Sequence, residues 1–310
     1  MRLIVTLTIN PAIDRNIEAD RLVFEDRAYI LSQSDSAGGR GIISSSVLHS
    51  FGSKTLAIVT SGGKTGKRFE KLLAASGFPV EVVRIAEEIR QNFTITDKHG
   101  LTIKLNQAGP PITDGELEQI ESAVAARLEK ADWLMLCGSI PPGVAPDFYR
   151  KLIGLAHKHN VKTLLDTDGE ALAHGVEAGP TVVKPSQQEA ERLLSRALIT
   201  RAHFLEAATR IKAMGPETVL ISLGSRGAIA TDGHRVVEAL APRIDAGSPI
   251  GAGDAMAAAY VWALTKKKDF PDAVRWAVAE GTASAKLPGM LSATLDQAKA
   301  IYKAVEVRVQ

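Results

Sequence analysis

The strongest constraint on the fold is a regular alternation of helical and strand-forming segments in the middle of the chain. Apolar, strand-like runs at 132–137 and 161–165 each follow an amphipathic stretch, at 114–130 and 146–160. The alternation continues with strands 181–183 and 218–222 and helices 187–194 and 202–214. Strands that alternate with helices of ~10–15 residues are typical of βαβ units. We therefore predict an α/β fold with a central, mostly parallel sheet covered by helices on both faces.

Other segments do not fit this alternation. Residues 15–33 are polar and weakly alternating, and 93–96 and 101–105 flank Asp97-Lys98-His99-Gly100, which is a hairpin signature. These segments predict a small β-sheet outside the main one, formed by about 12–35 and 88–107. Near the C-terminus we expect a hairpin around Asp232-Gly233, followed by helices to the end of the chain.

Composition limits the classes of function. Of the 310 residues, 45% are hydrophobic, and the net charge is only +2, with no basic block longer than Lys266-Lys267-Lys268. This argues against a nucleic-acid-binding face. The one cysteine, Cys137, lies in an apolar run and is expected to be a buried strand residue, which fits a reducing cytoplasm. No apolar run approaches ~18 residues, so we expect neither a membrane span nor a secretory leader, and a cytoplasmic location.

A glycine turn near the C-terminus is the first candidate for chemistry. Gly251-Ala252-Gly253 precedes Asp254, which opens an alanine-rich helical segment. Backbone N–H groups at a helix start are free to bind an anion such as phosphate, and the helix dipole favours negative charge there. A carboxylate beside such a turn is placed to take a proton from an attacking hydroxyl. The alternative is an ordinary Asp-capped helix.

Several other polar or glycine-rich clusters follow predicted strands. Asp14 comes just after the strand at 3–9, and a second glycine loop, at 36–41, opens another helix. The carboxyl ends of parallel strands meet at one sheet edge, where ligands bind in open α/β folds. We therefore expect these clusters to form one cleft suited to a phosphorylated ligand. For Asp14 alone, an ordinary surface turn is an equal alternative.

Four motifs occur in the order and spacing of a known family: TINPAID at 8–14, GGRG at 38–41, GSIPPG at 138–143 and GAGD at 251–254. The chain thus resembles the ribokinase-like (PfkB) carbohydrate kinases over essentially its whole length. IRQN at 89–92 resembles the branch of phosphofructokinases, 1-phosphofructokinase and tagatose-6-phosphate kinase. The resemblance implies one three-layer kinase domain over 1–310, a small β-sheet lid that often mediates dimerisation, ATP, Mg²⁺, and transfer of the γ-phosphoryl group to a sugar hydroxyl.

The resemblance also implies roles for individual residues. Asp254 would be the catalytic base, and the backbone amides of Gly251, Ala252 and Gly253 would form the anion hole. The implied substrate-binding residues are Asp14, Gly38, Gly39, Ile43, Arg90, Ser139 and Arg27, with Arg90 on the phosphate of the substrate. The implied nucleotide-binding residues are Lys184, Ser186, Glu189, Ser222, Gly224 and Gly227, with Glu189 acting on Mg²⁺ through water. For Arg27, which would reach the site of a partner subunit in a homodimer, a simple surface charge is an equal alternative.

Two departures from the family pattern concern ligand binding. Ile43 stands where the family usually has an asparagine whose amide contacts the sugar, and Ser186 replaces the first asparagine of the family's Asn-x-x-Glu motif. We expect a kinase of fructose 1-phosphate, fructose 6-phosphate or tagatose 6-phosphate. The alternatives are a free-sugar kinase of the same family and a kinase-like binding or regulatory protein with weakened turnover, which Ile43 keeps open.

Overall fold

The structure is a computed structural model in which residues 3–310 are described. Its strands are β1 (Leu3–Thr8), β2 (Ala12–Ala19), β3 (Ile30–Gly38), β4 (Thr55–Ser61), β5 (Val80–Arg84), β6 (Arg90–Asp97), β7 (Thr102–Asn106), β8 (Ala131–Cys137), β9 (Lys162–Asp166), β10 (Val182–Val183), β11 (Thr218–Ser222), β12 (Gly227–Thr231), β13 (Val236–Leu240) and β14 (Glu306–Val309). Its helices are α1 (Arg40–Ser50), α2 (Gly63–Ala74), α3 (Asp114–Leu128), α4 (Phe148–Lys158), α5 (Gly169–Glu177), α6 (Gln187–Leu193), α7 (Arg201–Ala213), α8 (Ala252–Thr265), α9 (Phe270–Ala285) and α10 (Leu295–Tyr302).

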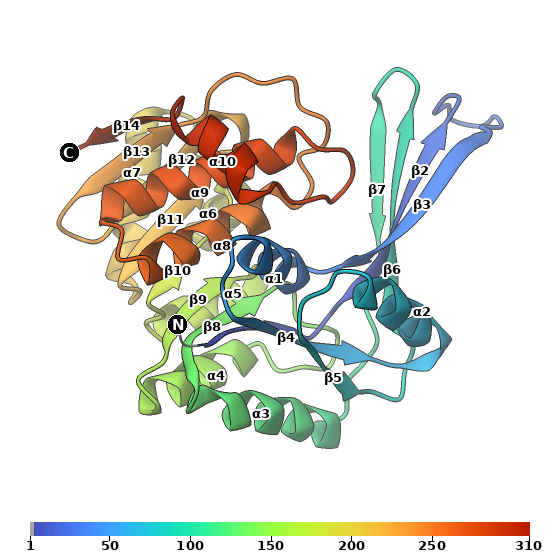
Figure 1. Cartoon of the computed structure of the whole chain (residues 1–310), viewed down its shortest axis with the longest axis horizontal. Helices are drawn as coiled ribbons and strands as arrows, with labels where there is room; N and C mark the ends of the chain where they lie inside the picture. Colours follow the sequence, from blue (N-terminus) through green and yellow to red (C-terminus); the bar gives the residue numbers. More distant parts are fainter. Residues whose placement is uncertain (1–2) are drawn as a thin grey trace.

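The main sheet has ten strands in the order β14-β13-β12-β11-β10-β9-β8-β1-β4-β5 (Figure 1). From β5 to β11 all neighbouring strands are parallel, and β12, β13 and β14 add on antiparallel. The α/β fold and its mostly parallel sheet are therefore confirmed. The predicted hairpin around Asp232-Gly233 joins β12 to β13.

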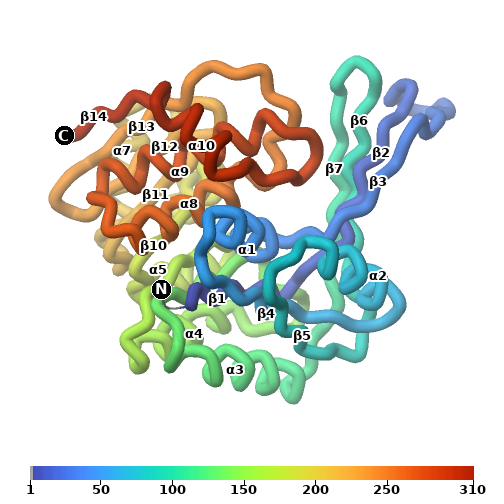
Figure 2. Tube along the Cα trace, in the orientation of Figure 1, coloured from blue at the N-terminus to red at the C-terminus, as the bar shows by residue number. Residues whose placement is uncertain are grey.

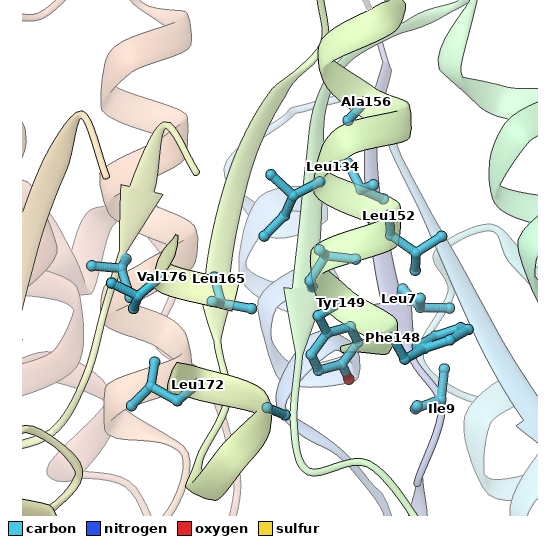
Figure 3. Packing of buried hydrophobic residues seen from close by; sticks show 14 of the residues in the cluster. Leu7, Ile9, Leu134, Phe148, Tyr149, Leu152, Ala156, Leu165, Leu172 and Val176 are labelled. Carbon is cyan, nitrogen blue, oxygen red and sulfur yellow. The ribbon is translucent and has the colours of Figure 1, made fainter. Parts of the chain in front are cut away.

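Helices cover both faces of this sheet. Successive residues of β8 illustrate the reason: Leu134 lies with Phe148 and Leu152 of α4 (Figure 3) in a core that also contains Leu136, while Met135 belongs to the core on the opposite face. A strand segment that is buried on both faces needs apolar residues at successive positions, which is why β8 is a continuous apolar run from Trp133 to Cys137. The second core contains α8 and α9. The helix α8 is buried on all sides from Ala255 to Ala263. Its many alanines let neighbouring elements pack closely against it.

The prediction that the chain ends in helices was wrong. After α10 the chain forms β14, whose Val309 pairs with Val237 of β13. A four-residue strand with alternating charge is too short to give a clear period-two signal in the sequence. Its pairing with the exposed edge of β13 determines its conformation.

A separate four-stranded sheet, in the order β3-β2-β6-β7, projects from the body of the protein (Figure 2). Its two hairpins are joined through β2 and β6, which run parallel although they are far apart in the sequence. Pairing aligns Asp14 of β2 with Asn92 of β6 and with Ser36 of β3, so these polar residues share one face of the sheet. None of the described helices has the length and apolar character needed to cross a membrane.

Candidate functional site

The glycine turn before α8 has the geometry of an anion-binding helix start. Gly251 adopts a left-handed conformation with φ 79°, and the first turn of α8 contains Asp254. A Cβ at position 251 would lie 3.0 Å from Cδ1 of Ile43, so both backbone freedom and limited space favour glycine here. Burial and the negative charge of Asp166 raise the pKa of Asp254 to about 7, even though Arg40 and Lys184 lower it. A carboxylate with this pKa is suited to proton transfer near neutral pH.

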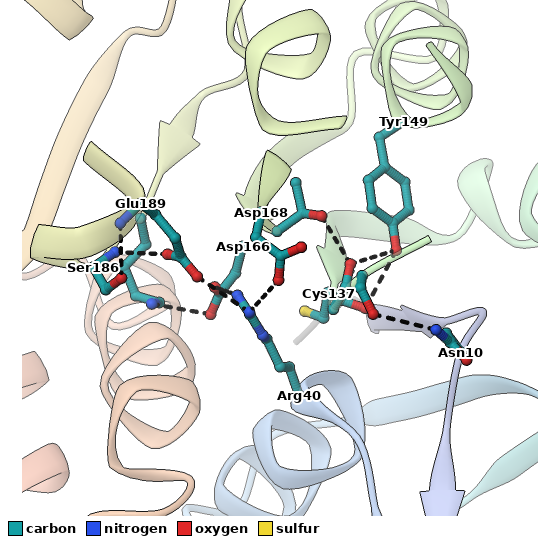
Figure 4. Close-up of polar contacts among 12 residues, drawn as sticks. Asn10, Arg40, Cys137, Tyr149, Asp166, Asp168, Ser186 and Glu189 are labelled. Carbon is teal, nitrogen blue, oxygen red and sulfur yellow. Dashed lines mark hydrogen bonds and ion pairs between the residues drawn. The ribbon is translucent and has the colours of Figure 1, made fainter. Parts of the chain in front are cut away.

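Arg40, at the start of α1, connects carboxylates from three different elements (Figure 4). Its Nη1 donates to Oδ1 of Asp166 at 2.8 Å, and its Nη2 donates to Oδ2 of Asp168 at 2.7 Å. Nη2 also lies 3.1 Å from Oε1 of Glu189. Burial opposes the charge on the guanidinium, but Asp166 and Glu189 hold the pKa of Arg40 well above its ordinary value. The arginine therefore fixes the carboxyl end of β9 against the starts of α5 and α6.

A second buried cation, Lys184, extends this cluster toward the glycine turn. Its Nζ lies 3.1 Å from Oδ2 of Asp166. A Cβ at Gly253 would be 3.6 Å from the same Nζ, so the ammonium group lies beside the first turn of α8. Burial lowers the pKa of Lys184, but Asp166 and other carboxylates outweigh this effect and raise it. The site therefore places a buried ammonium group beside the helix turn that contains the carboxylate of Asp254.

Ser186 and Glu189 form a capping box at the start of α6. Oγ of Ser186 accepts from the backbone N–H of Glu189 at 3.3 Å, and Oε2 of Glu189 accepts from the N–H of Ser186 at 2.7 Å. Because Oε1 of Glu189 faces Arg40, both carboxylate oxygens already have partners. Among the described residues no group of three or more acidic, histidine or cysteine side chains is arranged to hold a metal ion. The donor set therefore fits a magnesium ion that keeps its water ligands better than one bound directly by the protein.

A cavity of about 970 Å³ lies beside the glycine turn. Its lining includes Ser222, Gly224 and Gly227 from the β11–β12 connection together with Ala252 and Gly253 from α8. These residues were predicted to contact the nucleotide or the transferred phosphoryl group, and the structure brings them to one cavity.

Asp14, in β2, lies beside Gly38 of the glycine loop that precedes α1. Its Oδ1 accepts a 2.7 Å hydrogen bond from Nδ2 of Asn92. A Cβ at Gly38 would lie only 1.7 Å from Oδ2, so the carboxylate occupies the space that any larger residue would need. Burial raises the pKa of Asp14, while the hydrogen bond from Asn92 and the charge of Arg90 lower it.

Arg90 and Ser139 are linked through Asn10. Nε and Nη2 of Arg90 donate to the carbonyl oxygen of Asn10, and Nη1 donates to that of Gln107 at 3.1 Å. Nδ2 of Asn10 donates to Oγ of Ser139 at 3.2 Å. The loop that carries Ser139 is fixed in turn, because the hydroxyl of Tyr149 donates to the carbonyl of Gly138 (Figure 4). Three of the five N–H donors of Arg90 are thus bonded to backbone carbonyl oxygens of the protein, which leaves two for a ligand.

The remaining predicted residues have different surroundings. Gly39 precedes α1 with φ 144°. Ile43 is buried within α1 and packs against Gly251, so it presents a methyl group where an amide was expected from the family pattern. Arg27 is exposed in the connection between β2 and β3, and this connection lies at the outer end of the small sheet (Figure 1).

Sequence analysis missed three residues that organise the site: Arg40, Asp166 and Asn92. Arg40 and Asn92 belong to the GGRG and IRQN motifs, and Asp166 is the last residue of the strand β9. A cation at a helix start is unusual, because the helix dipole disfavours positive charge there. That anomaly was a signal that Arg40 has carboxylate partners.

Comparison with known proteins agrees with this geometry. The pfkB family carbohydrate kinase profile matches residues 2–296. The ATP-dependent 6-phosphofructokinase isozyme 2 of Escherichia coli is 30% identical over 303 residues, covering 96% of this chain and 97% of that protein. The 1-phosphofructokinase of Borreliella burgdorferi is 30% identical over 284 residues, covering 91% and 92%. The tagatose-6-phosphate kinase of Staphylococcus epidermidis is 27% identical over 308 residues, covering 98% and 99%.

Among solved structures, Escherichia coli phosphofructokinase-2 in complex with potassium superposes with a TM-score of 0.91 at 29% identity, covering 98% of this chain and 99% of that one. The fold, the glycine turn with its carboxylate and the extent of the sequence match lead to the same assignment: the chain is a carbohydrate kinase of the pfkB family.

Proposed function

We propose that this kinase transfers the γ-phosphoryl group of ATP to a hydroxyl of a phosphorylated ketohexose. Fructose 1-phosphate, fructose 6-phosphate and tagatose 6-phosphate are the candidates. The single observation that carries the reaction type is Asp254, a carboxylate with a pKa of about 7 in the first turn of α8, beside a glycine turn and a large cavity. The names of the relatives favour a phosphorylated acceptor.

In the proposed mechanism, Asp254 accepts the proton of the attacking hydroxyl. Backbone amides of Gly251 to Gly253 donate hydrogen bonds to the oxygens on which charge develops, and Lys184 adds positive charge from the side of the turn. Phosphoryl transfer depends mainly on positioning and on charge stabilisation, so this arrangement suffices without a covalent intermediate.

We assign the nucleotide to the cavity that contains Ser222, Gly224 and Gly227. Ser186 acts through the capping box, which orients Glu189 toward the cluster. A magnesium ion bound with the nucleotide would neutralise phosphate charge, and Glu189 would orient one of its water ligands. The carboxylates of Asp166, Asp168, Glu189 and Asp254 all act on Arg40, and this concentration of negative charge favours uptake of a divalent cation.

The acceptor is assigned to the side of Asp14, Gly38, Gly39 and Ser139, with the two free N–H donors of Arg90 directed to its phosphate. Residues 12–35 and 88–107 would act as the lid over this single kinase domain. Because Ile43 offers no hydrogen bond, the acceptor is held by fewer side-chain contacts than in relatives with asparagine at this position. Substrate choice and affinity are therefore where this enzyme would differ from them.

We further propose a homodimer that forms through the small sheet. One face of this sheet is polar, whereas Ile103 and Leu105 on the other face are exposed. An apolar sheet face of this kind is typical of an interaction surface, and a second copy of the sheet matches it in shape and chemistry. Escherichia coli phosphofructokinase-2 has a tetrameric inhibited form, which shows that a relative self-associates. In such a dimer Arg27 would lie near the partner subunit.

The test is a coupled assay of ADP release with fructose 1-phosphate, fructose 6-phosphate, tagatose 6-phosphate and the corresponding free sugars. Asp254→Asn serves as the matched inactive control. We expect turnover with at least one sugar phosphate and loss of nearly all of it in the variant. Turnover with free sugars only would favour a free-sugar kinase. Binding of ATP without turnover on any acceptor would refute the kinase assignment and favour a regulatory protein.

A further inference from the structure

We propose that Asn92 is a positioning residue for acceptor recognition: its side-chain amide holds the Asp14 carboxylate in one orientation, with the second oxygen left for a hydroxyl of the sugar. The inference rests on the proposed function, because it concerns the acceptor side of the same site. It assigns a role to the third position of the β6 strand, two residues beyond Arg90.

The contact is built into the sheet. β2 and β6 pair in parallel, with Asp14 directly opposite Asn92, so their side chains leave the same face of neighbouring strands. Nδ2 of Asn92 lies 2.7 Å from Oδ1 of Asp14, which is the short distance of a hydrogen bond to a charged acceptor. Only the amide nitrogen can face a carboxylate favourably, so the orientation of the asparagine is also fixed.

The other oxygen of Asp14 is confined from the opposite side. It occupies the space above Gly38, where a Cβ would be 1.7 Å away. Gly38 ends β3 and leads into the glycine motif before α1, so Oδ2 lies on the side of the proposed sugar site. Asn92 therefore holds one oxygen of the carboxylate, and the absence of a side chain at Gly38 leaves room for the other.

The hydrogen bond from Asn92 also opposes protonation of Asp14, which is largely buried. Burial raises the pKa of Asp14, and the two groups that counteract it are Asn92, through its hydrogen bond, and Arg90, through its charge. From β3, Oγ of Ser36 donates to the backbone carbonyl of Asp14 and not to its carboxylate. Without Asn92, only Arg90 would oppose protonation, and most of its donors are used by Asn10 and Gln107.

The test uses Asp254→Asn as the parent protein, because it removes turnover and the titration of the base. Fructose 6-phosphate is the probe, with fructose 1-phosphate and tagatose 6-phosphate as further ligands, and binding is measured by calorimetry from pH 5.5 to 8.5. Asn92→Leu keeps the size but removes the donor, and Asn92→Asp places a second carboxylate beside Asp14. Asn106→Leu is the control, since Asn106 lies opposite Asn92 in β7 and is exposed.

We expect Asn92→Leu to weaken binding about 10-fold at pH 8. The loss should grow as the pH falls, because Asp14 then takes up a proton. Asn92→Asp should lose affinity most strongly at high pH, where two adjacent carboxylates repel each other. Asn106→Leu should stay within about 2-fold of the parent, as is usual for exposed substitutions. A merely structural role for Asn92 predicts a loss that does not change with pH.

A second measurement needs no ligand. In protein labelled with ¹³C at the Asp carboxyl carbons, Asp14→Asn identifies the Asp14 signal, and its titration should move to higher pH in Asn92→Leu. If the parent binds no sugar phosphate, the proposed function fails, while the titration still decides whether Asn92 controls Asp14. Equal binding by parent and Asn92→Leu at every pH, together with an unchanged Asp14 titration, would overturn the inference.

Discussion

Replacing Arg40 by methionine should destabilise the protein more than an ordinary surface substitution does. Methionine keeps the length and much of the apolar contact of the side chain but removes the charge. The Arg40 side chain is 27% exposed, and of the side chains of its three carboxylate partners Asp166 is 1% exposed, Glu189 11% and Asp168 37%. The three ion pairs therefore contribute different amounts to the free energy of unfolding.

Most of the expected loss in the free energy of unfolding comes from the ion pair with Asp166. Removing one partner of a buried ion pair typically costs about 3–5 kcal/mol, whereas an exposed pair contributes about 0–1 kcal/mol. The contact with Asp168 belongs to the second class. The cost at Asp166 is reduced because Lys184 still lies 3.1 Å from its other oxygen and because water reaches Arg40. We therefore expect a loss of about 2–4 kcal/mol in the free energy of unfolding.

Urea denaturation followed by circular dichroism measures this loss. Asp166→Asn should recover part of the stability in the Arg40→Met background, because it removes the uncompensated charge, so the double-mutant cycle should give a coupling of at least about 1 kcal/mol. Arg196→Met, which breaks an exposed pair with Glu206, is the control and should change stability by less than about 1 kcal/mol. If Arg40→Met is no less stable than this control, or if the cycle gives no coupling, the electrostatic reasoning is wrong.

Three further predictions concern the base, the acceptor site and the small sheet. Because the pKa of Asp254 is raised to about 7 in the folded protein, its contribution to stability is present below pH ~4 and is lost as the pH rises through 7. The Asp254→Asn variant should therefore gain stability relative to the wild type over this range, and the gain should reach about 2–4 kcal/mol at pH 8. Urea denaturation at each pH measures this difference. Ile43→Asn should lower KM for the acceptor several-fold with little change in KM for ATP; no change would mean that the site has been rebuilt around the isoleucine. Leu105→Asp should shift the proposed dimer to monomer in sedimentation experiments, whereas Ile199→Asp, at an exposed position away from this sheet, should not.

Much of the fold could be predicted from local sequence. The run at 133–137 is apolar at every position, because β8 contributes to the cores on both faces of the sheet. The strand β14 could not be found in this way. Its residues are mostly exposed, and its pairing with β13 depends on contacts between segments about 70 residues apart. Edge strands of this kind leave little pattern in their own sequence.

In the site, too, some residues can be predicted from glycine motifs in the local sequence, whereas others depend on the pairing of distant segments. Gly251 and Gly38 are recognisable in the sequence as parts of glycine motifs, and glycine is needed there because larger residues would collide with Ile43 and Asp14. Asn92 carries no such signal: nothing in its own segment indicates that a strand about 78 positions earlier will place a carboxylate 2.7 Å away. Arg40 is similar, since its partners come from β9, α5 and α6. Motifs identify the backbone that must approach a ligand closely, whereas the side chains that set the charge and orientation of the reacting groups are defined only by the assembled sheets. In this protein those side chains, more than the glycine motifs, are where substrate choice can change while the chemistry is kept.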